Sequence, residues 1–486
     1  MIDDLESNMQ PDNMQSSSDK FPMTQCQVPG SQSDINILYM TSSKKYLYLL
    51  TENGEILCIE SKTLNPIQQS FSLSSSSSSG SNSFKENLTK IWTDRVGNHN
   101  IIRYKGKIYY FNVLCGIGKE LDCFKNIEIC AVGFDDNNDN QKSTGLFLAA
   151  DCDNNIYECK INLEQRTNDY RINDSIQKLT TLVFDDWDTE EDEEYSEPKQ
   201  PKYERIYGIK FLKTTKPEKK RSPNDDFYYI IIATKTKFYQ FKGPGEKTFL
   251  QLFERFNKHP ILFNDYCRYF PSVPKISKIF TGSDVDIIYK NDKVEQFGWK
   301  TESGFCFGNF NIIDFLPNDL TNFTVIPFEK INSKGIKETG LEPLSVAHTS
   351  NHIFVLYKDC LTIVSKLTSN IVHTEYLERD FNGVVFNEFA EENGIILLYS
   401  TNGLYQISLK DENKEIWKDY LDIGDYDNAI KLVEQNKKLK RRIYRIDADE
   451  VYDANDYLNS VMKYISSDEK FEIVCLKYLK FNERSI

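Results

Sequence analysis

At about residue 410 the spacing of apolar residues changes from a strand pattern to a helix pattern. Before this point apolar residues form short runs separated by turn residues such as Asn and Gly. After Leu409 they recur at positions i, i+3, i+4 and i+7 as far as Ile486. Side chains alternate on a strand but return every three to four residues on a helix, so the two patterns require different elements. The sequence therefore predicts a mainly β protein with an α-helical tail.

Seven segments of the β block share the form of a hairpin, in which an apolar run, a short polar turn and a second alternating run follow one another. These segments begin at Tyr46, Ile101, Gly145, Phe227, Phe297, Ile353 and Gly394. Their recurrence predicts an N-terminal β-propeller over residues 35–409, and we expect seven blades of roughly 50 residues each. The 28 Tyr and 31 Phe of the chain also favour strands. A pair of large β-sandwiches is an alternative that the pattern leaves open.

Four segments have compositions that do not favour a packed core. We expect residues 1–34 to form a disordered N-terminal segment, and we expect disordered insertions near residues 70–84, 185–202 and 213–226. The first insertion is rich in serine, the second is acidic and the third is mainly basic. The acidic insertion could hold a basic partner, but we interpret it as a solvated loop between strands.

Residues 410–486 are predicted to be the start of an α-solenoid built from helical hairpins. In the first helix Trp417, Tyr420 and Leu421 share a face, and Gly424 is placed to end it. Later stripes comprise Tyr426, Ala429, Ile430 and Val433; Ile443, Ile446, Asp447 and Val451; Tyr457, Leu458, Val461 and Ile465; and Phe471, Val474, Cys475 and Tyr478. No such helix buries its stripe alone, so the helices must pack against one another. Because no polar cap closes the stack, we expect a fragment, a shortened product or one end of a larger solenoid.

Charge and cysteine usage exclude several classes of protein. The net charge of −14 argues against a sequence-wide affinity for nucleic acid or anionic lipid. The N-terminus lacks the basic and apolar regions of a secretory signal, and no apolar run is long enough to cross a bilayer. The 11 cysteines form no CxxC pair, which indicates free thiols in a reducing compartment. We therefore predict a cytosolic protein without a metal site or a cofactor.

Four motifs resemble functional sites, and we assign none of them to catalysis or cofactor binding. The sequence around Cys306 has the outline of a nucleophile elbow, but its aromatic neighbours alternate as on a strand. Gly116–Gly118 lacks the third glycine of a dinucleotide fingerprint. We interpret His348 and His352 as ordinary polar positions beside a strand, and the basic run Lys437–Arg442 as a solvated helix face. We predict no enzyme, no catalytic residue and no small-molecule substrate; a propeller hydrolase that uses the acidic segment 185–197 is the enzymatic alternative.

The helical tail carries the residues by which the chain resembles the deep-orange family of vacuolar protein sorting proteins, the eighteen or Pep-three type. The matching positions at the start of the tail are Glu412, Trp417, Tyr420, Leu421, Tyr426, Asp427 and Ala429. A second set comprises Phe471, Glu472, Val474, Leu476, Lys477 and Tyr478. Weaker similarity extends over most of residues 35–480, including the segments 144–161, 233–243 and 297–310.

This resemblance implies a protein-interaction scaffold in the class C vacuolar sorting tethers, HOPS and CORVET, acting in docking and fusion at endosomal and vacuolar membranes. The implied partners are the other class C subunits and, indirectly, SNAREs and Rab GTPases, with peripheral membrane association. The family also carries a long solenoid and a zinc-binding RING, and this sequence lacks most of the former and all cysteines of the latter. Zinc binding is therefore not transferred to this chain. The alternative is another propeller–solenoid scaffold of the clathrin, coatomer or nucleoporin kind.

Overall fold

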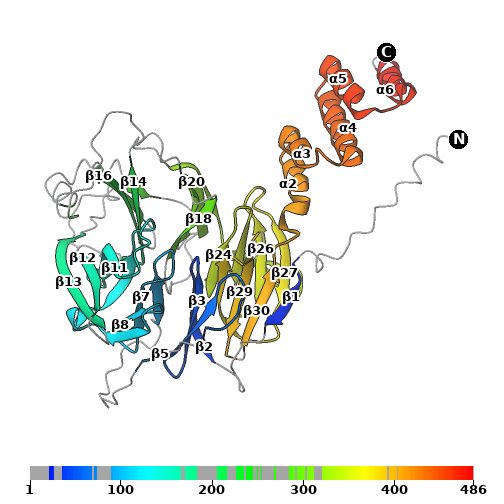
Figure 1. Cartoon of the computed structure of the whole chain (residues 1–486). Coiled ribbons are helices and arrows are strands. Elements are labelled where there is room, and N and C mark those ends of the chain that lie inside the picture. Colours follow the sequence, from blue (N-terminus) through cyan, green and yellow to red (C-terminus); the bar gives the residue numbers. More distant parts are fainter. Residues whose placement is uncertain are drawn as a thin grey trace, which may run out of the picture.

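Seven four-stranded antiparallel sheets make up most of the described part of the chain (Figure 1). The structure is a computed structural model, and it describes residues 21–26, 36–67, 71–73, 89–165, 170–182, 205–215, 226–234, 237–244, 249, 253, 267–269, 284–290, 293–301, 304–310, 320–390, 393–401 and 403–484. Within this part the strands lie between Met23 and Ser408, and the α-helices follow from Ile416.

Six of the sheets follow one another along the chain, each with its strands in sequence order. They are β2 (Ile37–Ser42), β3 (Tyr46–Thr51), β4 (Glu55–Glu60) and β5 (Phe71–Ser72); β6 (Lys90–Thr93), β7 (Asn100–Tyr104), β8 (Lys107–Asn112) and β9 (Ile117–Glu120); β10 (Ile129–Gly133), β11 (Ser143–Asp151), β12 (Asn155–Gln165) and β13 (Tyr170–Thr181); β14 (Gly208–Thr215), β15 (Asp226–Ala233), β16 (Lys237–Pro244) and β17 (Cys267–Tyr269); β18 (Asp284–Lys290), β19 (Lys293–Thr301), β20 (Gly304–Phe310) and β21 (Leu320–Ile326); and β24 (Ser345–His348), β25 (His352–Leu356), β26 (Cys360–Ser365) and β27 (Ile371–Tyr376). A small hairpin of β22 (Glu329–Ile331) and β23 (Lys337–Thr339) lies between the fifth and sixth sheets.

The seventh sheet combines the two ends of the β block. Strands β28 (Phe381–Asn387), β29 (Ile395–Ser400) and β30 (Gly403–Ser408) pair in order, and β1 (Met23–Cys26) pairs with the free edge of β30. Met23 lies opposite Ile407 and Cys26 lies opposite Leu404. This pairing closes the ring of sheets, and it corrects the expectation that residues 1–34 are wholly disordered. The strand is only four residues long, and its partly exposed side chains gave no alternation strong enough to predict it.

Each sheet packs face to face against the sheets on both sides of it. Seven apolar clusters of buried residues lie between neighbouring sheets, including one between the first and the seventh. On β29, Ile395 and Leu397 pack towards the first sheet, whereas Ile396 and Leu398 pack towards the sixth. Successive residues of a strand thus enter different clusters, which explains why these strands are continuous apolar runs. The arrangement is a closed seven-bladed β-propeller, and the alternative of two sandwiches is wrong.

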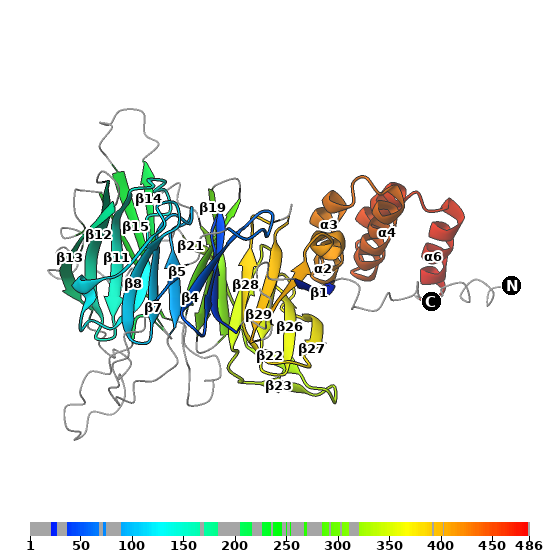
Figure 2. The ribbon, with the colours of Figure 1, turned by 60° about the horizontal axis from the view of Figure 1, so that its bottom comes forward.

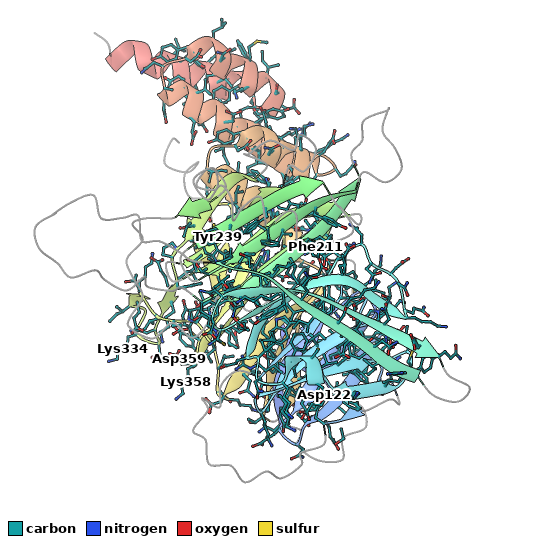
Figure 3. All side chains as sticks on the ribbon, turned by 90° about the vertical axis from the view of Figure 1, so that its left-hand side faces the viewer. Asp122, Phe211, Tyr239, Lys334, Lys358 and Asp359 are labelled. Atoms are coloured by element: carbon teal, nitrogen blue, oxygen red, sulfur yellow. The ribbon has the colours of Figure 1, made fainter. Side chains whose placement is uncertain are left out.

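The side chains illustrate how these clusters are built. Phe211 and Tyr239, labelled in Figure 3, are buried in the cluster between the third and fourth sheets, whereas Lys334 and Lys358 lie at the surface. Each of the seven predicted hairpins forms the second and third strands of one sheet, beginning with β3 and β4. These central strands are buried on both faces, so their apolar runs are the ones that the sequence displays most clearly.

The predicted insertions lie mostly outside the described residues. Residues 185–202 are not described at all, and neither are 74–84 or 216–225. Three boundaries differ from the expectation, because Phe71–Ser72 forms strand β5, strand β14 continues as far as Thr215 and strand β15 begins at Asp226. In each place the backbone pairs with the neighbouring strand of the same sheet.

A short 3-10 turn, η5 (Glu412–Glu415), leads from the propeller into the helices, which project away from the sixth and seventh sheets (Figures 1 and 2). The helices are α2 (Ile416–Asp422), α3 (Tyr426–Leu432), α4 (Lys437–Asp453), α5 (Tyr457–Ser467) and α6 (Phe471–Arg484). Asp425, Asn436 and Asp456 cap α3, α4 and α5, since each side chain accepts a hydrogen bond from a backbone N–H of the first turn. Gly424, with a φ of 74°, ends α2 in the left-handed conformation, as predicted.

Candidate functional site

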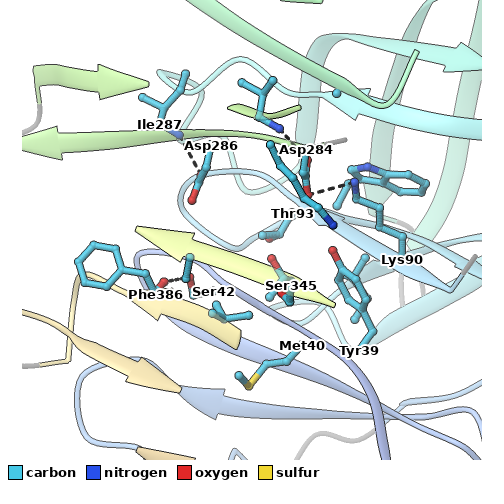
Figure 4. Close-up of a pocket in the computed structure, with 18 of the residues that line it drawn as sticks. Tyr39, Met40, Ser42, Lys90, Thr93, Asp284, Asp286, Ile287, Ser345 and Phe386 are labelled. Carbon is cyan, nitrogen blue, oxygen red and sulfur yellow. Dashed lines mark hydrogen bonds and ion pairs between the residues drawn. The ribbon is translucent and has the colours of Figure 1, made fainter. Parts of the chain in front are cut away.

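A central cavity of about 540 Å³ is lined by the first strand of all seven sheets and by residues beside those strands. Two pairs of oppositely charged side chains line it, and Figure 4 shows the pair of Lys90 and Asp284. The Lys90 Nζ lies 3.2 Å from the Asp284 Oδ2, and the Lys210 Nζ lies 3.8 Å from the Asp286 Oδ1. The whole lining carries six basic and five acidic side chains, so it gathers charges of both signs.

The two catalytic or cofactor motifs weighed from the sequence lie on strands and turns. Cys306 is fully buried on β20, as the alternation of its neighbours predicted, and burial raises the pKa of its thiol. Such a thiol is a poor nucleophile. Gly118 lies on β9, and no helix follows it in the manner of a dinucleotide fold. A Cβ on Gly118 would lie 2.0 Å from the Phe71 ring, so this glycine permits close packing of two strands.

His348 and His352 are both buried, and His352 belongs to the joint between the propeller and the helices, where it meets Glu412. His352 begins β25, and its Nδ1 lies 2.8 Å from the Oε1 of Glu412 in η5. The hydroxyl of Thr349 donates to the same carboxylate oxygen. His348 ends β24, and its Nδ1 lies 2.9 Å from the Nζ of Lys366. The sequence did not indicate these contacts, because the partners of both histidines are distant along the chain.

Further contacts extend this joint on either side. The Ser365 hydroxyl donates to the Asp419 Oδ2 of α2 at 2.7 Å, and the Asn351 Nδ2 donates to the Asn413 Oδ1 at 2.7 Å. The ring of Phe21, just before β1, lies edge-on to the His352 ring with centroids 5.5 Å apart. The joint thus brings together the start of the β block, its sixth sheet and the first helices. From the sequence, Glu412 stood out only because it matches a residue of the deep-orange family; nothing indicated its contacts with the sixth sheet.

The first helices pack as predicted. Ala429, Val433 and Ile443 form a buried cluster, and the predicted stripe residues Trp417, Tyr420, Leu421, Tyr426 and Ile430 pack against it. Helix α4 packs against α5 through Ala448, whose carbonyl oxygen accepts a hydrogen bond from the Ser460 hydroxyl at 2.8 Å. Ser460 and Tyr464 are buried on α5.

The predicted apolar stripe of α5 is only partly buried: Tyr457 and Val461 are half-buried, whereas Leu458 and Ile465 are exposed, as is Met462. Leu458, Met462 and Ile465 are 77%, 60% and 69% exposed, and they are spaced i, i+4 and i+7 along one face. On α6, Phe471, Leu476 and Leu479 are exposed as well. We call these six residues the apolar arm surface. Exposed large apolar side chains that gather on a helix face mark candidate protein–protein contact sites.

The basic run on α4 is an exposed helix face, as interpreted from the sequence. Arg441 pairs with the Asp468 Oδ2 at 2.6 Å, and Arg445, one turn further, pairs with the Glu469 Oε2 at 3.0 Å. Among the described residues, no group of three or more His, Cys, Asp or Glu side chains is placed to hold a metal ion. No helix within the described ranges is both long and apolar enough to cross a bilayer.

The closed ring of seven sheets, followed by helical hairpins fixed to it at a buried joint, defines the class of protein as a β-propeller with a helical arm. The model of the Pep3/Vps18/deep orange beta-propeller domain family matches residues 20–409. The chain belongs to this family. The matched range begins just before β1, so it includes the strand that closes the ring.

Two curated relatives are similar over long stretches. The Vacuolar sorting protein 18 of Arabidopsis thaliana is 24% identical over 272 residues, which cover 53% of this chain and 26% of that protein. The Vacuolar protein sorting-associated protein 18 homolog of Drosophila melanogaster is 22% identical over 382 residues, covering 74% of this chain and 33% of the relative. The matched part of the chain thus spans about a quarter to a third of these relatives. The solved β-propeller domain of Myceliophteria thermophila Cps50 (Swd1) aligns with a TM-score of 0.47 and 9% identity over 79% of this chain and 99% of that domain.

Proposed function

We propose that the chain is a protein-interaction scaffold subunit of the class C vacuolar sorting tethers, HOPS or CORVET, and acts in the docking and fusion of endosomal and vacuolar membranes. The observation that carries this proposal is the family match over residues 20–409. The curated relatives are named for vacuolar sorting, which supports the same process. In this proposal the partners are other class C subunits, with SNAREs and Rab GTPases reached indirectly, and the chain lies peripherally on these membranes without binding nucleic acid.

The apolar arm surface supports an assembly role for the helices. We propose that residues 410–486 are the start of an α-solenoid and that one partner docks on this surface. Leu458, Met462 and Ile465 present a continuous apolar stripe, which suits the apolar face of a partner helix. In the described residues, neither the central cavity nor the buried Cys306 supplies an arrangement that favours an enzyme.

Affinity purification of the tagged full chain tests the proposal. We expect other class C subunits to be recovered with it, and failure to recover any of them would contradict the proposal. The double variant Leu458→Asp/Ile465→Asp should reduce recovery of a partner that docks on the arm. Ile336→Asp is the matched control, because Ile336 is 57% exposed near the β22–β23 hairpin, away from the arm. Equal recovery with both variants would show that the apolar arm surface is not the docking site.

Another propeller–solenoid scaffold, of the clathrin, coatomer or nucleoporin kind, is the second candidate because it shares the same architecture. Localisation of the tagged chain separates the two. Endosomal or vacuolar puncta agree with the tethering proposal, whereas a nuclear rim favours a pore scaffold.

A further inference from the structure

Positively charged side chains follow one face of α4 along its first three turns. They stand in two neighbouring rows in which successive members are four residues apart, so they share that face of the helix. We call these exposed residues the basic stripe; they are Lys437, Lys438, Arg441, Arg442 and Arg445. No Asp or Glu occurs between Gln435 and Ile446, so no acidic residue of α4 itself interrupts the stripe.

The fold leaves the basic stripe uncovered by the neighbouring helices. Helix α3 packs against the opposite side of α4, where Leu439 and Ile443 join the cluster around Ala429. Helix α5 packs on the later turns of α4, around Ala448. The stripe thus lies outside the packed interior of the arm, and its side chains do not serve the core.

Within the described part of the chain, three of the five cations lack a carboxylate partner. Arg441 and Arg445 pair with the turn after α5 at 2.6 and 3.0 Å, and their side chains remain 56% and 48% exposed. Lys437, Lys438 and Arg442 form no ion pair with any described residue. Their charges are therefore available to an anionic partner.

This concentration of charge opposes the stability of α4 itself. The amino end of a helix carries a partial positive charge and favours acidic residues, yet the first turn of α4 has none. Like charges four residues apart, such as Lys438 and Arg442, also repel each other. Positions at which a sequence breaks such local rules are expected at functional sites. The stripe is therefore better explained by a binding role than by the folding of the arm.

We propose that the basic stripe contacts the anionic headgroups of a membrane surface. This inference rests on the proposed function, because it supplies a direct contact for a chain that lies peripherally on membranes. Clusters of four or more Lys and Arg on a helix with an apolar face are typical of binding to anionic lipid. The stripe covers about 12 Å of one helix face, and such a convex face suits a flat array of headgroups better than an acidic peptide, which binds in a groove.

An exposed apolar side chain lies next to the stripe. Leu432, the last residue of α3, is 53% exposed and precedes the short turn that leads into α4. Long Lys and Arg side chains reach headgroup phosphates, while an apolar neighbour enters the boundary with the acyl chains. The start of α4 thus offers both kinds of group that a membrane surface binds.

The charge of the whole chain makes this contact directional. With a net charge of −14, most of the molecular surface is repelled by an anionic membrane. The arm projects away from the sixth and seventh sheets (Figure 1), so the stripe can meet a membrane while the ring of sheets stays further from it. Because charges are screened over about 8 Å at physiological ionic strength, the attraction acts only where the stripe approaches directly.

Flotation of the purified full chain with lipid vesicles tests this proposal. We expect binding to vesicles of phosphatidylcholine and phosphatidylserine, little binding to phosphatidylcholine alone, and weaker binding as salt is added. The triple variant Lys437→Gln/Lys438→Gln/Arg442→Gln should lower the partition coefficient on anionic vesicles about 100-fold, since each cation near the surface strengthens binding about fivefold. It should keep the melting temperature of the wild type or raise it slightly, because it removes repulsion within α4.

The matched control removes the same charge from exposed positions outside the arm. Lys119→Gln/Lys334→Gln/Lys358→Gln should bind anionic vesicles like the wild type. No binding of the wild type, or equal binding of the wild type and the stripe variant, would overturn the proposal. Binding to polyglutamate but not to anionic vesicles would overturn it in favour of an acidic protein partner. Recovery of class C subunits by affinity purification does not require the stripe, so that experiment tests the proposed function separately.

Discussion

Glu412 shows how much of this architecture depends on single buried polar groups. Its side chain is 4% exposed, and its Oε1 accepts a hydrogen bond from the Thr349 hydroxyl and lies 2.8 Å from the His352 Nδ1. A buried carboxyl group is tolerable at such a site only because it has hydrogen-bonding partners. The same residue begins the turn that leads into the helices, so its hydrogen bonds hold the helical arm on the sixth sheet.

We predict that Glu412→Ala lowers the free energy of unfolding by about 3 kcal/mol, because it removes two hydrogen bonds and leaves buried His352 without its partner. Urea unfolding followed by tryptophan fluorescence measures the change. Glu415→Ala is the control; its carboxylate pairs with the Lys418 Nζ at 2.9 Å near the surface, and we expect a loss of about 0.5 kcal/mol or less. Similar losses in the two variants would argue against a structural role for the joint.

Lys366 is a second buried charge, and it makes stability depend on pH. Its Nζ contacts the Gln296 Oε1 at 2.8 Å, the His348 Nδ1 at 2.9 Å and the Thr349 carbonyl. Burial lowers the pKa of this ammonium group to about 7, against the favourable charges of Glu412 and other carboxylates. In the unfolded chain the lysine pKa is ordinary, so above pH 7 the unfolded chain binds a proton that the folded chain does not bind. The free energy of unfolding therefore rises with pH in this range.

Between pH 7 and 8.5 the free energy of unfolding should rise more steeply in the wild type than in Lys366→Met, by up to about 1.4 kcal/mol for each pH unit. Denaturant unfolding at several pH values measures both slopes. Lys358→Met, which removes an exposed lysine, should keep the slope of the wild type. A Lys366→Met slope equal to that of the wild type would contradict the lowered pKa.

At the scale of elements, the accuracy of the sequence predictions follows burial. The second and third strands of each sheet were predictable because both of their faces are apolar, as Ile395–Leu398 illustrate. Strand β1 was missed because backbone pairing with β30, rather than apolar alternation, holds it in place. Helix α5 was predicted in extent but only partly in orientation. Serine and tyrosine hydroxyls face α4, and periodicity alone does not show that a polar face is the buried one.

Removal of the closing strand tests its contribution. We expect deletion of residues 1–26 to lower the melting temperature and to cost at least about 3 kcal/mol, since it exposes the edge of β30 and removes the buried Phe21. Deletion of residues 1–19, which removes none of the described contacts, is the control and should leave the melting temperature unchanged. Calorimetry of both truncated chains measures the difference. An equal melting temperature for the two would show that β1 contributes little to the ring.

At the scale of the whole molecule, the joint decides how the helical arm stands relative to the ring. Contacts from Ser365 to Asp419 and from His352 to Glu412 fix α2 and η5 on the sixth sheet at two separate points. A single contact would allow the helical arm to rotate about it, whereas these two contacts together prevent that rotation. A scaffold presents its partners at defined distances only if such a joint is stiff.

We predict that the double variant Ser365→Ala/Glu412→Gln increases the radius of gyration and broadens the distance distribution in small-angle scattering, because the arm gains freedom about its attachment. Lys414→Ala, at an exposed position of η5, is the control and should scatter like the wild type. Unchanged scattering of the double variant, with its ring still folded, would show that other contacts orient the arm.

The pairing of β1 with β30 also has a consequence for synthesis. During synthesis Met23 leaves the ribosome early, whereas Ile407 leaves it only after the other sheets have emerged. Strand β1 therefore stays unpaired until β30 has been synthesised. During that interval the nascent ring is open, and its edges are free to pair with other chains. The turn that holds Glu412 emerges directly after β30, so the last step of ring formation and the docking of the arm coincide. A chaperone that shields open sheet edges would therefore act on this chain until β30 has emerged and paired with β1.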